Sequence, residues 1–303
     1  MLEQLFGGLT RTELNFQLLG NGPRRPYAPV MGIIDQDIFI HGGTENGSTA
    51  LNNMYKYNLV TQQWITLQPA NNPAARWAAS YGVIDGRLII YGGFGGGSAI
   101  FNDLREYQPD KNTWASLGTG PSARTGAASL VIGDDLYIQG GSAGGSTRMR
   151  SALRYNRVEN KWYTLANMPF GCNVHPATLL DGYIYSFGGL LDNGISNSLV
   201  RYNIATNSYQ ILTTGAGGPS GRYQSMLFAH QGKIHLFGGE TSPNNVFNEW
   251  WVYDPVTNTW EKIGASPMGA KSGVAHHRVG NHLFVYGGRT TGGYSNELWR
   301  IDL

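Results

Sequence analysis

Basic residues recur at one fixed distance upstream of four of the six Gly-Gly pairs, and three of the six equivalent positions are followed by an aromatic residue. The position 16 residues before each pair holds Pro26 (beside Arg24 and Arg25), Arg76, Arg124, Cys172, Arg222 and Lys271. The next position holds Tyr27, Trp77, Thr125, Asn173, Tyr223 and Ser272. Guanidinium groups bind carboxylates or phosphates in forked geometry, and aromatic faces suit sugar rings and apolar side chains. These residue types together indicate a basic, aromatic-lined binding surface.

A structural interpretation of the same cations stays open. Each could cap loop carbonyl groups or pair with a neighbouring acid, without meeting a ligand. The fourth copy departs from the pattern, because it offers Cys172 and His175 in the stretch FGCNVHPATLL. This departure would leave a gap in a ring of cations and would help to orient an asymmetric ligand.

Small, polar and dissimilar segments follow the Gly-Gly pairs, as expected of surface loops that carry recognition on a rigid scaffold. The residues that stand out in them are Glu45, Phe94, Arg148, Asp192, Glu240, Arg289 and Tyr294. We treat them as possible loop contacts, although any single one is also explained as a solvated side chain.

Several kinds of chemistry find no support in the sequence. The glycine-rich GGFGGGS is not followed by Gly-Lys-Ser/Thr, so it is not a phosphate-binding loop. His276 and His277 are adjacent on an expected strand and point to opposite faces, so they cannot share one metal ion. With Cys172 as the only cysteine, a thiolate zinc site is excluded. We therefore expect no catalytic residues, no metal and no cofactor.

The overall composition narrows the class of protein. The 303 residues carry a formal net charge of +2 and only 14% charged residues, which gives no reason to expect nucleic acid as a partner. No apolar run is long enough to span a membrane, and the first residues do not resemble a signal peptide. The localisation stays open between a virion or extracellular surface and the cytoplasm, and the oligomeric state is unknown.

Internal repetition predicts the elements that hold these residues. The pairs Gly42-Gly43, Gly92-Gly93, Gly140-Gly141, Gly188-Gly189, Gly238-Gly239 and Gly287-Gly288 lie 48 to 50 residues apart. Each follows an alternating apolar run such as RLIIYGG, which is typical of a strand. A tyrosine and a second aromatic residue, as in Tyr57 and Trp64, follow at a separation of seven residues. One repeat is therefore four strands, with the glycines closing the second and the aromatics on the third and fourth.

The strand, the Gly-Gly pair and the spaced Tyr and Trp together resemble the kelch repeat. The resemblance covers essentially the whole chain and implies a six-bladed β-propeller of four-stranded antiparallel blades. The sixth copy ends before its last strand, and RTELNFQLLG places Phe16 where other copies have Trp. We therefore expect residues 10–20 to complete the last blade within a single free-standing domain, 1–303. Residues 1–9 would be a short extension that packs on the ring or docks onto another protein.

The scaffold, its variable loops and the lack of a reaction signature favour a non-catalytic module that binds a protein or glycan partner. A virion tail or receptor-binding component is one such role. The alternative is an enzyme similar to the kelch-type sugar mutarotases, acting on an acidic sugar such as sialic acid. In that case Glu45, Asp192 or Glu240 would act as general acid and base. The ligand-binding candidates at the mouth of the propeller are Arg25, Tyr27, Arg76, Trp77, Arg124, His175, Arg222, Tyr223 and Lys271.

Overall fold

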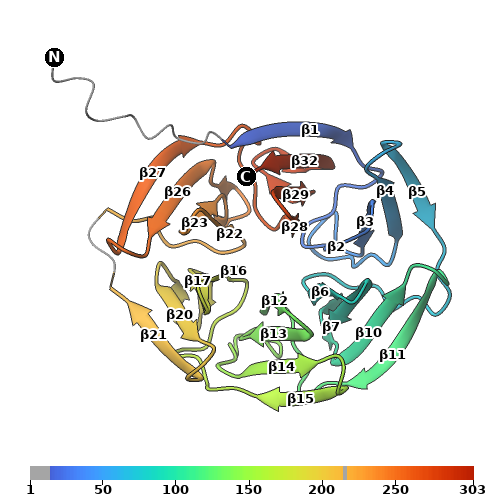
Figure 1. Cartoon of the computed structure of the whole chain (residues 1–303), viewed down its shortest axis with the longest axis horizontal. Coiled ribbons are helices and arrows are strands. Elements are labelled where there is room, and N and C mark those ends of the chain that lie inside the picture. The colour runs from blue at the N-terminus through green and yellow to red at the C-terminus, as the bar shows by residue number, and fades with distance from the viewer. Residues whose placement is uncertain (1–13, 214–216) are drawn as a thin grey trace.

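The computed structural model describes residues 14–213 and 217–303, and every regular element in these ranges is a β-strand. Six four-stranded antiparallel sheets surround a central axis as blades, and the chain visits them in sequence order (Figure 1). The predicted six-bladed propeller is confirmed. No helix long and apolar enough to cross a membrane occurs in the part of the chain that the structure describes.

The first five blades each use four consecutive long strands, from the axis outward. Blade 1 holds β2 (Val30–Ile34), β3 (Asp37–His41), β4 (Met54–Asn58) and β5 (Gln63–Leu67). Blade 2 holds β6 (Ser80–Ile84), β7 (Arg87–Tyr91), β10 (Asp103–Gln108) and β11 (Thr113–Thr119). Blade 3 holds β12 (Ala128–Ile132), β13 (Asp135–Gln139), β14 (Ala152–Asn156) and β15 (Lys161–Thr164). Blade 4 holds β16 (Ala177–Leu180), β17 (Tyr183–Phe187), β20 (Leu199–Asn203) and β21 (Ser208–Leu212). Blade 5 holds β22 (Met226–His230), β23 (Lys233–Phe237), β26 (Glu249–Asp254) and β27 (Thr259–Ala265).

Blade 6 is built from both ends of the chain. It holds β28 (Ala275–Val279), β29 (His282–Tyr286) and β32 (Glu297–Asp302), and its outermost strand is β1 (Asn15–Asn21). In the antiparallel ladder between β1 and β32, Phe16 lies opposite Ile301 and Leu18 lies opposite Trp299. The first described strand thus completes the last blade, as the alignment of Phe16 predicts. The expected extension, residues 1–9, lies outside the described residues.

The Gly-Gly pairs dock each blade onto the next one. The second glycine donates a backbone hydrogen bond to the link that enters the following blade, as from Gly43 to the Arg76 carbonyl at 2.9 Å. The first glycine makes room for this contact, because a Cβ on Gly42 would lie 2.4 Å from the same oxygen. Its φ of 69° is also unfavourable for other residues. The glycine spacing therefore records the contact between neighbouring blades.

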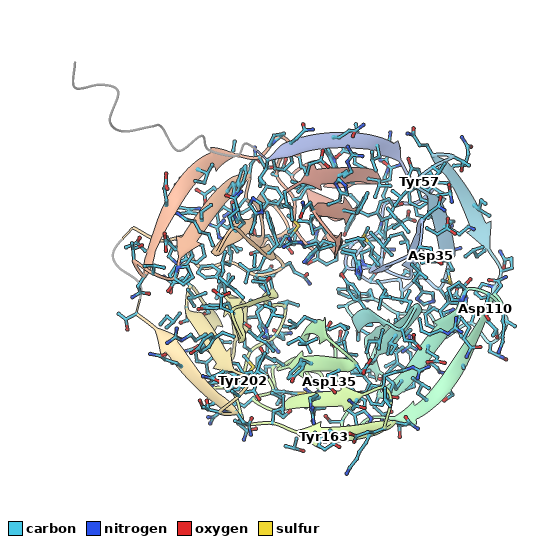
Figure 2. All side chains as sticks on the ribbon, viewed as in Figure 1. Asp35, Tyr57, Asp110, Asp135, Tyr163 and Tyr202 are labelled. Atoms are coloured by element: carbon cyan, nitrogen blue, oxygen red, sulfur yellow. The ribbon has the colours of Figure 1, made fainter. Side chains whose placement is uncertain are left out.

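The spaced aromatic residues fill the space between blades. Tyr57 on β4 is 2% exposed, and its ring centre lies 5.0 Å from that of Trp64 on β5. Trp64 in turn lies 5.3 Å from Tyr286 of blade 6. Figure 2 shows Tyr57 and Tyr202 among the side chains that occupy the blades. Each aromatic pair thus packs between its blade and the neighbouring blade and stabilises their contact through apolar burial.

A closed belt of six backbone hydrogen bonds surrounds the axis near one face. Its members lie two residues after the repeated cationic position and have φ between 49° and 63°: Ala28, Ala78, Gly126, Val174, Gln224 and Gly273. Each N–H donates to the carbonyl of the equivalent residue in the preceding blade, from Ala78 to Ala28 and finally from Ala28 to Gly273, over 2.6–2.9 Å. We call this set the hydrogen-bonded belt. It joins blade 6 to blade 1 independently of β1.

Candidate binding face

Two sets of loops meet on the face next to the belt, namely the links that enter each blade and the loops that follow each Gly-Gly pair. In each blade, the residue that directly precedes the belt residue forms two backbone hydrogen bonds with the residue that directly follows the Gly-Gly pair. The six pairs are Tyr27 with Thr44, Trp77 with Phe94, Thr125 with Ser142, Asn173 with Leu190, Tyr223 with Glu240, and Ser272 with Arg289. We call the surface formed by these twelve residues and their loops the mouth face. The paired backbones hold its side chains in fixed positions.

The repeated cations lie beneath the mouth face and are occupied by partners within the protein. Arg76 is 1% exposed, donates to the Gly92 carbonyl and forms a forked pair with Asp103 at 2.7 and 3.0 Å. Arg222 is 0% exposed, and it donates to the Gly238 carbonyl at 3.2 Å and, through a single contact, to Glu249 at 2.6 Å. Both cations therefore stabilise the Gly-Gly turn of their own blade by hydrogen bonding to its carbonyl group.

Arg124 repeats the contact with the glycine carbonyl, whereas Lys271 is held by side chains. Arg124, which is 1% exposed, donates to the Gly140 carbonyl and to Ser151. Lys271, which is 2% exposed, donates to Ser295 and Glu297. The structure thus favours the structural interpretation of Arg76, Arg124, Arg222 and Lys271 over the interpretation as an exposed cationic ring. His175 is also buried, at 5% exposure, beside the glycine turns of blades 3 and 4.

Cys172 takes the place of the cation in blade 4. Its Sγ lies 3.4 Å from the Gly188 carbonyl, which is the group that an arginine contacts in other blades. Burial raises the pKa of this thiol to about 12, so it stays protonated and donates weakly to that carbonyl. The departure of blade 4 is therefore a change in internal packing rather than a gap in an exposed ring.

The electrostatics of these pairs follow from burial and hydrogen bonding. Burial disfavours ionisation of Glu249, but hydrogen bonds from Lys262, Arg222 and Trp251 outweigh it and lower its pKa to about 2. Burial lowers the pKa of Arg222 and of Arg124, and each stays a cation because a guanidinium group is not deprotonated in proteins. These pairs hold fixed charges at neutral pH and serve the scaffold.

One half of the mouth face is closed by a network that joins blades 5, 6 and 1. Tyr27 donates its hydroxyl to Glu240 at 2.7 Å, and Arg289 contacts both oxygens of the same carboxylate at 3.1 and 3.3 Å. The Arg289 guanidinium stacks 4.5 Å from the Tyr27 ring centre, and it donates to the Tyr294 hydroxyl. Burial and the nearby carboxylate raise the pKa of Tyr27 well above its usual value, so its hydroxyl remains a donor.

The other half carries partly exposed aromatic residues around small polar ones. Trp77 and Phe94 of blade 2 pack edge to face with ring centres 5.5 Å apart, and Tyr223 lies on blade 5. Between them, blades 3 and 4 present Thr125 and Asn173. We call this region the open half of the mouth face. It offers aromatic anchors at its two ends and a floor of small side chains between them.

The remaining loop candidates differ in how free they are. Glu45 accepts hydrogen bonds from the Arg24 side chain and from the backbone N–H of Arg25. Asp192 accepts the backbone N–H of Arg148, which ties the loop of blade 3 to that of blade 4. Glu240 is 0% exposed within the network described above. All three acids proposed for mutarotase chemistry thus have structural partners, and no observation favours that reaction.

A central cavity of about 520 Å³ lies behind the belt and is lined by residues from all six blades. The Tyr81 hydroxyl from blade 2 reaches the backbone N and O of His276 on blade 6, both at 3.4 Å. Burial lowers the pKa of His276 to about 4, so the ring is neutral at pH 7. Within residues 14–213 and 217–303, no group of three or more His, Cys, Asp or Glu side chains is placed to hold a metal ion.

The network of Tyr27, Glu240 and Arg289 could not be assembled from the sequence. Tyr27 and Glu240 are separated by 213 positions, and only the ring geometry brings them together. The sequence does single out Arg289 among the loop residues, but not as the partner of Glu240. The one available signal is positional, because Glu240 and Arg289 each directly follow a Gly-Gly pair.

Comparison with known families agrees with this architecture. The KLHDC2/KLHL20/DRC7 Kelch-repeats domain matches residues 10–189 and 174–303, which together cover nearly the whole chain. The chain belongs to this kelch family. Kelch propeller domains generally mediate protein interactions, and this generality fits the rigid loop-bearing mouth face.

Individual kelch relatives are more distant. Kelch domain-containing protein 3 of Bos taurus and of Homo sapiens is 29% identical over 146 residues, which cover 42% of this chain and 37% of the relative. Kelch domain-containing protein 10 of Xenopus tropicalis is 29% identical over 136 residues, which cover 41% of this chain and 33% of the relative. The matched part spans about a third of the length of these kelch relatives.

Proposed function

We propose that this chain is a non-catalytic binding module that holds a segment of a partner protein on the open half of its mouth face. The observation that carries the proposal is the separation of roles among the mouth residues. The cations are buried in the scaffold, whereas Trp77, Phe94 and Tyr223 are partly exposed. Tryptophan and tyrosine supply much of the binding energy at protein interfaces, because they bury large areas with little loss of side-chain entropy.

The buried backbone of the mouth face supports the same proposal. In each mouth pair, the backbone N–H and C=O groups of both residues are hydrogen-bonded to each other. A partner would therefore be recognised by the side chains of the mouth face. A floor of Thr125 and Asn173 between aromatic ends suits a narrow extended segment whose backbone can bond these polar groups. A glycan partner is a narrower alternative that rests on the same partly exposed aromatic residues, and a virion tail or receptor-binding role is one that rests on the composition of the chain.

The test compares partners captured by the full chain with those captured by mouth variants. Phe94→Ala and Tyr223→Ala each truncate an anchor, whereas Val256→Ser changes a residue that is 92% exposed in the turn between β26 and β27 at the opposite end of blade 5. A partner identified by quantitative mass spectrometry is then titrated by calorimetry. Truncation of an interface anchor costs about 2 kcal/mol, so we expect about 30-fold weaker binding for either mouth variant.

Thermal melts of each variant show whether the fold is intact. A partner that binds the mouth variants as tightly as the unaltered chain and the Val256→Ser control would refute the proposed face. Binding to a glycan array that is lost in Tyr223→Ala, without any protein partner, would replace the protein by a sugar ligand.

A further inference from the structure

A second concave site lies on blade 6, outside the mouth pairs. Its volume is about 460 Å³, and residues from three segments line it. Asn21 and Arg25 come from the segment that leaves β1, Lys271 comes from the link into blade 6, and Thr290, Tyr294 and Glu297 come from the last repeat. We call this site the rim pocket. It is distinct from the open half of the mouth face, which lies over blades 2 to 5.

The charges of the rim pocket do not cancel. Lys271 and Glu297 form an ion pair at 2.7 Å and neutralise each other. The Arg25 side chain is exposed, and no acidic partner for its guanidinium occurs among the residues that the structure describes. The adjacent Arg24 differs, because it is paired with Glu45 at 2.9 Å. The lining therefore has two cations and one carboxylate, and one positive charge remains.

Donors converge on the same space from a buried position. Lys271 is 2% exposed and donates to Ser295 and Glu297, while an ammonium group has three protons to donate. The Thr291 hydroxyl adds a neutral donor to the lining, and the Asn296 amide has a second proton besides the one it donates to the Gly22 carbonyl. A buried cation with an unused proton, next to a forked guanidinium, is the donor set that an oxyanion requires.

We propose that the rim pocket binds a small anionic ligand through its carboxylate or phosphate group. Arg25 supplies the forked contact, and Lys271 supplies the remaining proton from the wall. The volume exceeds that of a bare oxyanion, and the surrounding hydroxyl and amide groups suit a ligand that also bears hydroxyl groups. This site does not depend on the proposed function of the mouth face.

The position of the rim pocket links ligand binding to closure of the ring. Asn21 ends β1, and the adjacent Gly22 donates to the Asn296 carbonyl at 2.7 Å while Asn296 donates back to the Gly22 carbonyl at 2.8 Å. A ligand that contacts both the segment that leaves β1 and the last repeat binds only when β1 is paired with β32 in blade 6. Because such a ligand binds the folded state alone, it raises the unfolding temperature as its concentration rises.

The experiment titrates the full chain with inorganic phosphate, acetate and D-glucuronate. Binding is followed by calorimetry, and the unfolding temperature is followed by intrinsic tryptophan fluorescence at constant ionic strength set with chloride. We expect saturable binding of at least one probe, with a matching rise in unfolding temperature. Phosphate alone or the two carboxylates alone would identify which oxyanion the pocket takes.

The adjacent arginines provide a matched pair of variants. Arg25→Ala should weaken binding at least 10-fold, and Arg25→Lys should give an intermediate loss, because the charge remains without the fork. Arg24→Ala should bind as the unaltered chain does. Absence of saturable binding, or equal binding by Arg25→Ala and Arg24→Ala, overturns the proposal. The unfolding temperatures without ligand show whether each variant is folded.

Discussion

Buried neutral histidines should make this propeller unfold in mild acid. Burial lowers the pKa of His41 to about 3, reinforced by the charge of Arg76 and opposed by Asn72. Burial also lowers the pKa of His175 to about 4 and that of His235 to about 3. All three side chains are less than 9% exposed. In the unfolded chain, each would titrate near its ordinary value of about 6.5.

The sign of the effect follows from the direction of these shifts. Below pH 6.5 the unfolded chain takes up protons that the folded state refuses, so stability is complete above this pH and falls toward pH 3–4. One pH unit is worth about 1.4 kcal/mol per group, so at pH 5 each histidine costs about 2 kcal/mol and the three together about 6 kcal/mol. This is comparable to the whole stability of a typical domain, about 5–15 kcal/mol.

The assay is urea unfolding followed by tryptophan fluorescence at pH 7.5, 6.0 and 5.0. The matched variant is His41→Phe, because the equivalent positions in blades 4 and 5 hold Phe187 and Phe237. Its free energy of unfolding should lose about 2 kcal/mol less than that of the unaltered chain between pH 7.5 and 5.0. Glu249 does not titrate in this pH range, because hydrogen bonds from Lys262, Arg222 and Trp251 lower its pKa to about 2. Parallel pH profiles for the two proteins would refute the reasoning.

Two further predictions concern the scaffold. Arg222→Met should destabilise the fold by about 3 kcal/mol, because it removes a 0% exposed cation from the Gly238 carbonyl and from Glu249. Lys262→Met should cost under about 1 kcal/mol, because Lys262 is half exposed. Equal melting temperatures of the two variants would contradict this prediction. Gly92→Ala should lower the free energy of unfolding in urea by over about 3 kcal/mol, because its Cβ would lie 2.4 Å from the Arg124 carbonyl oxygen. Gly86→Ala should lower it by only about 1–2 kcal/mol, because the φ of 64° is unfavourable for alanine but the nearest atom to its Cβ would be 4.0 Å away. Similar losses for both glycine variants would show that the close approach of the blades relaxes.

The sequence predicts the scaffold well because its strongest signals are contacts between blades. The first glycine of each pair recurs because a neighbouring carbonyl oxygen approaches to within 2.2–2.5 Å of where its Cβ would be. Phe16 predicts the closing strand because RTELNFQLLG places it where the last strand of the other repeats has Trp, and it lies opposite Ile301 in the structure.

The binding face is harder to predict from the same repeat. A cation placed 16 residues before Gly-Gly is equally consistent with an exposed ring and with a buried lock on the glycine carbonyl. The direction of the Arg76 side chain depends on Asp103, which belongs to a later strand of its blade. The asymmetry of the mouth depends on Tyr27 reaching across blade 6 to Glu240, and no local spacing encodes it.

The hydrogen-bonded belt and the six mouth pairs engage the main-chain amide of every one of their residues. The main chain around the opening is thereby the same whatever side chains it carries. Exchanging those side chains alone would change the binding specificity of the mouth face while leaving this backbone frame intact. The frame is thus a natural platform for grafting new recognition surfaces.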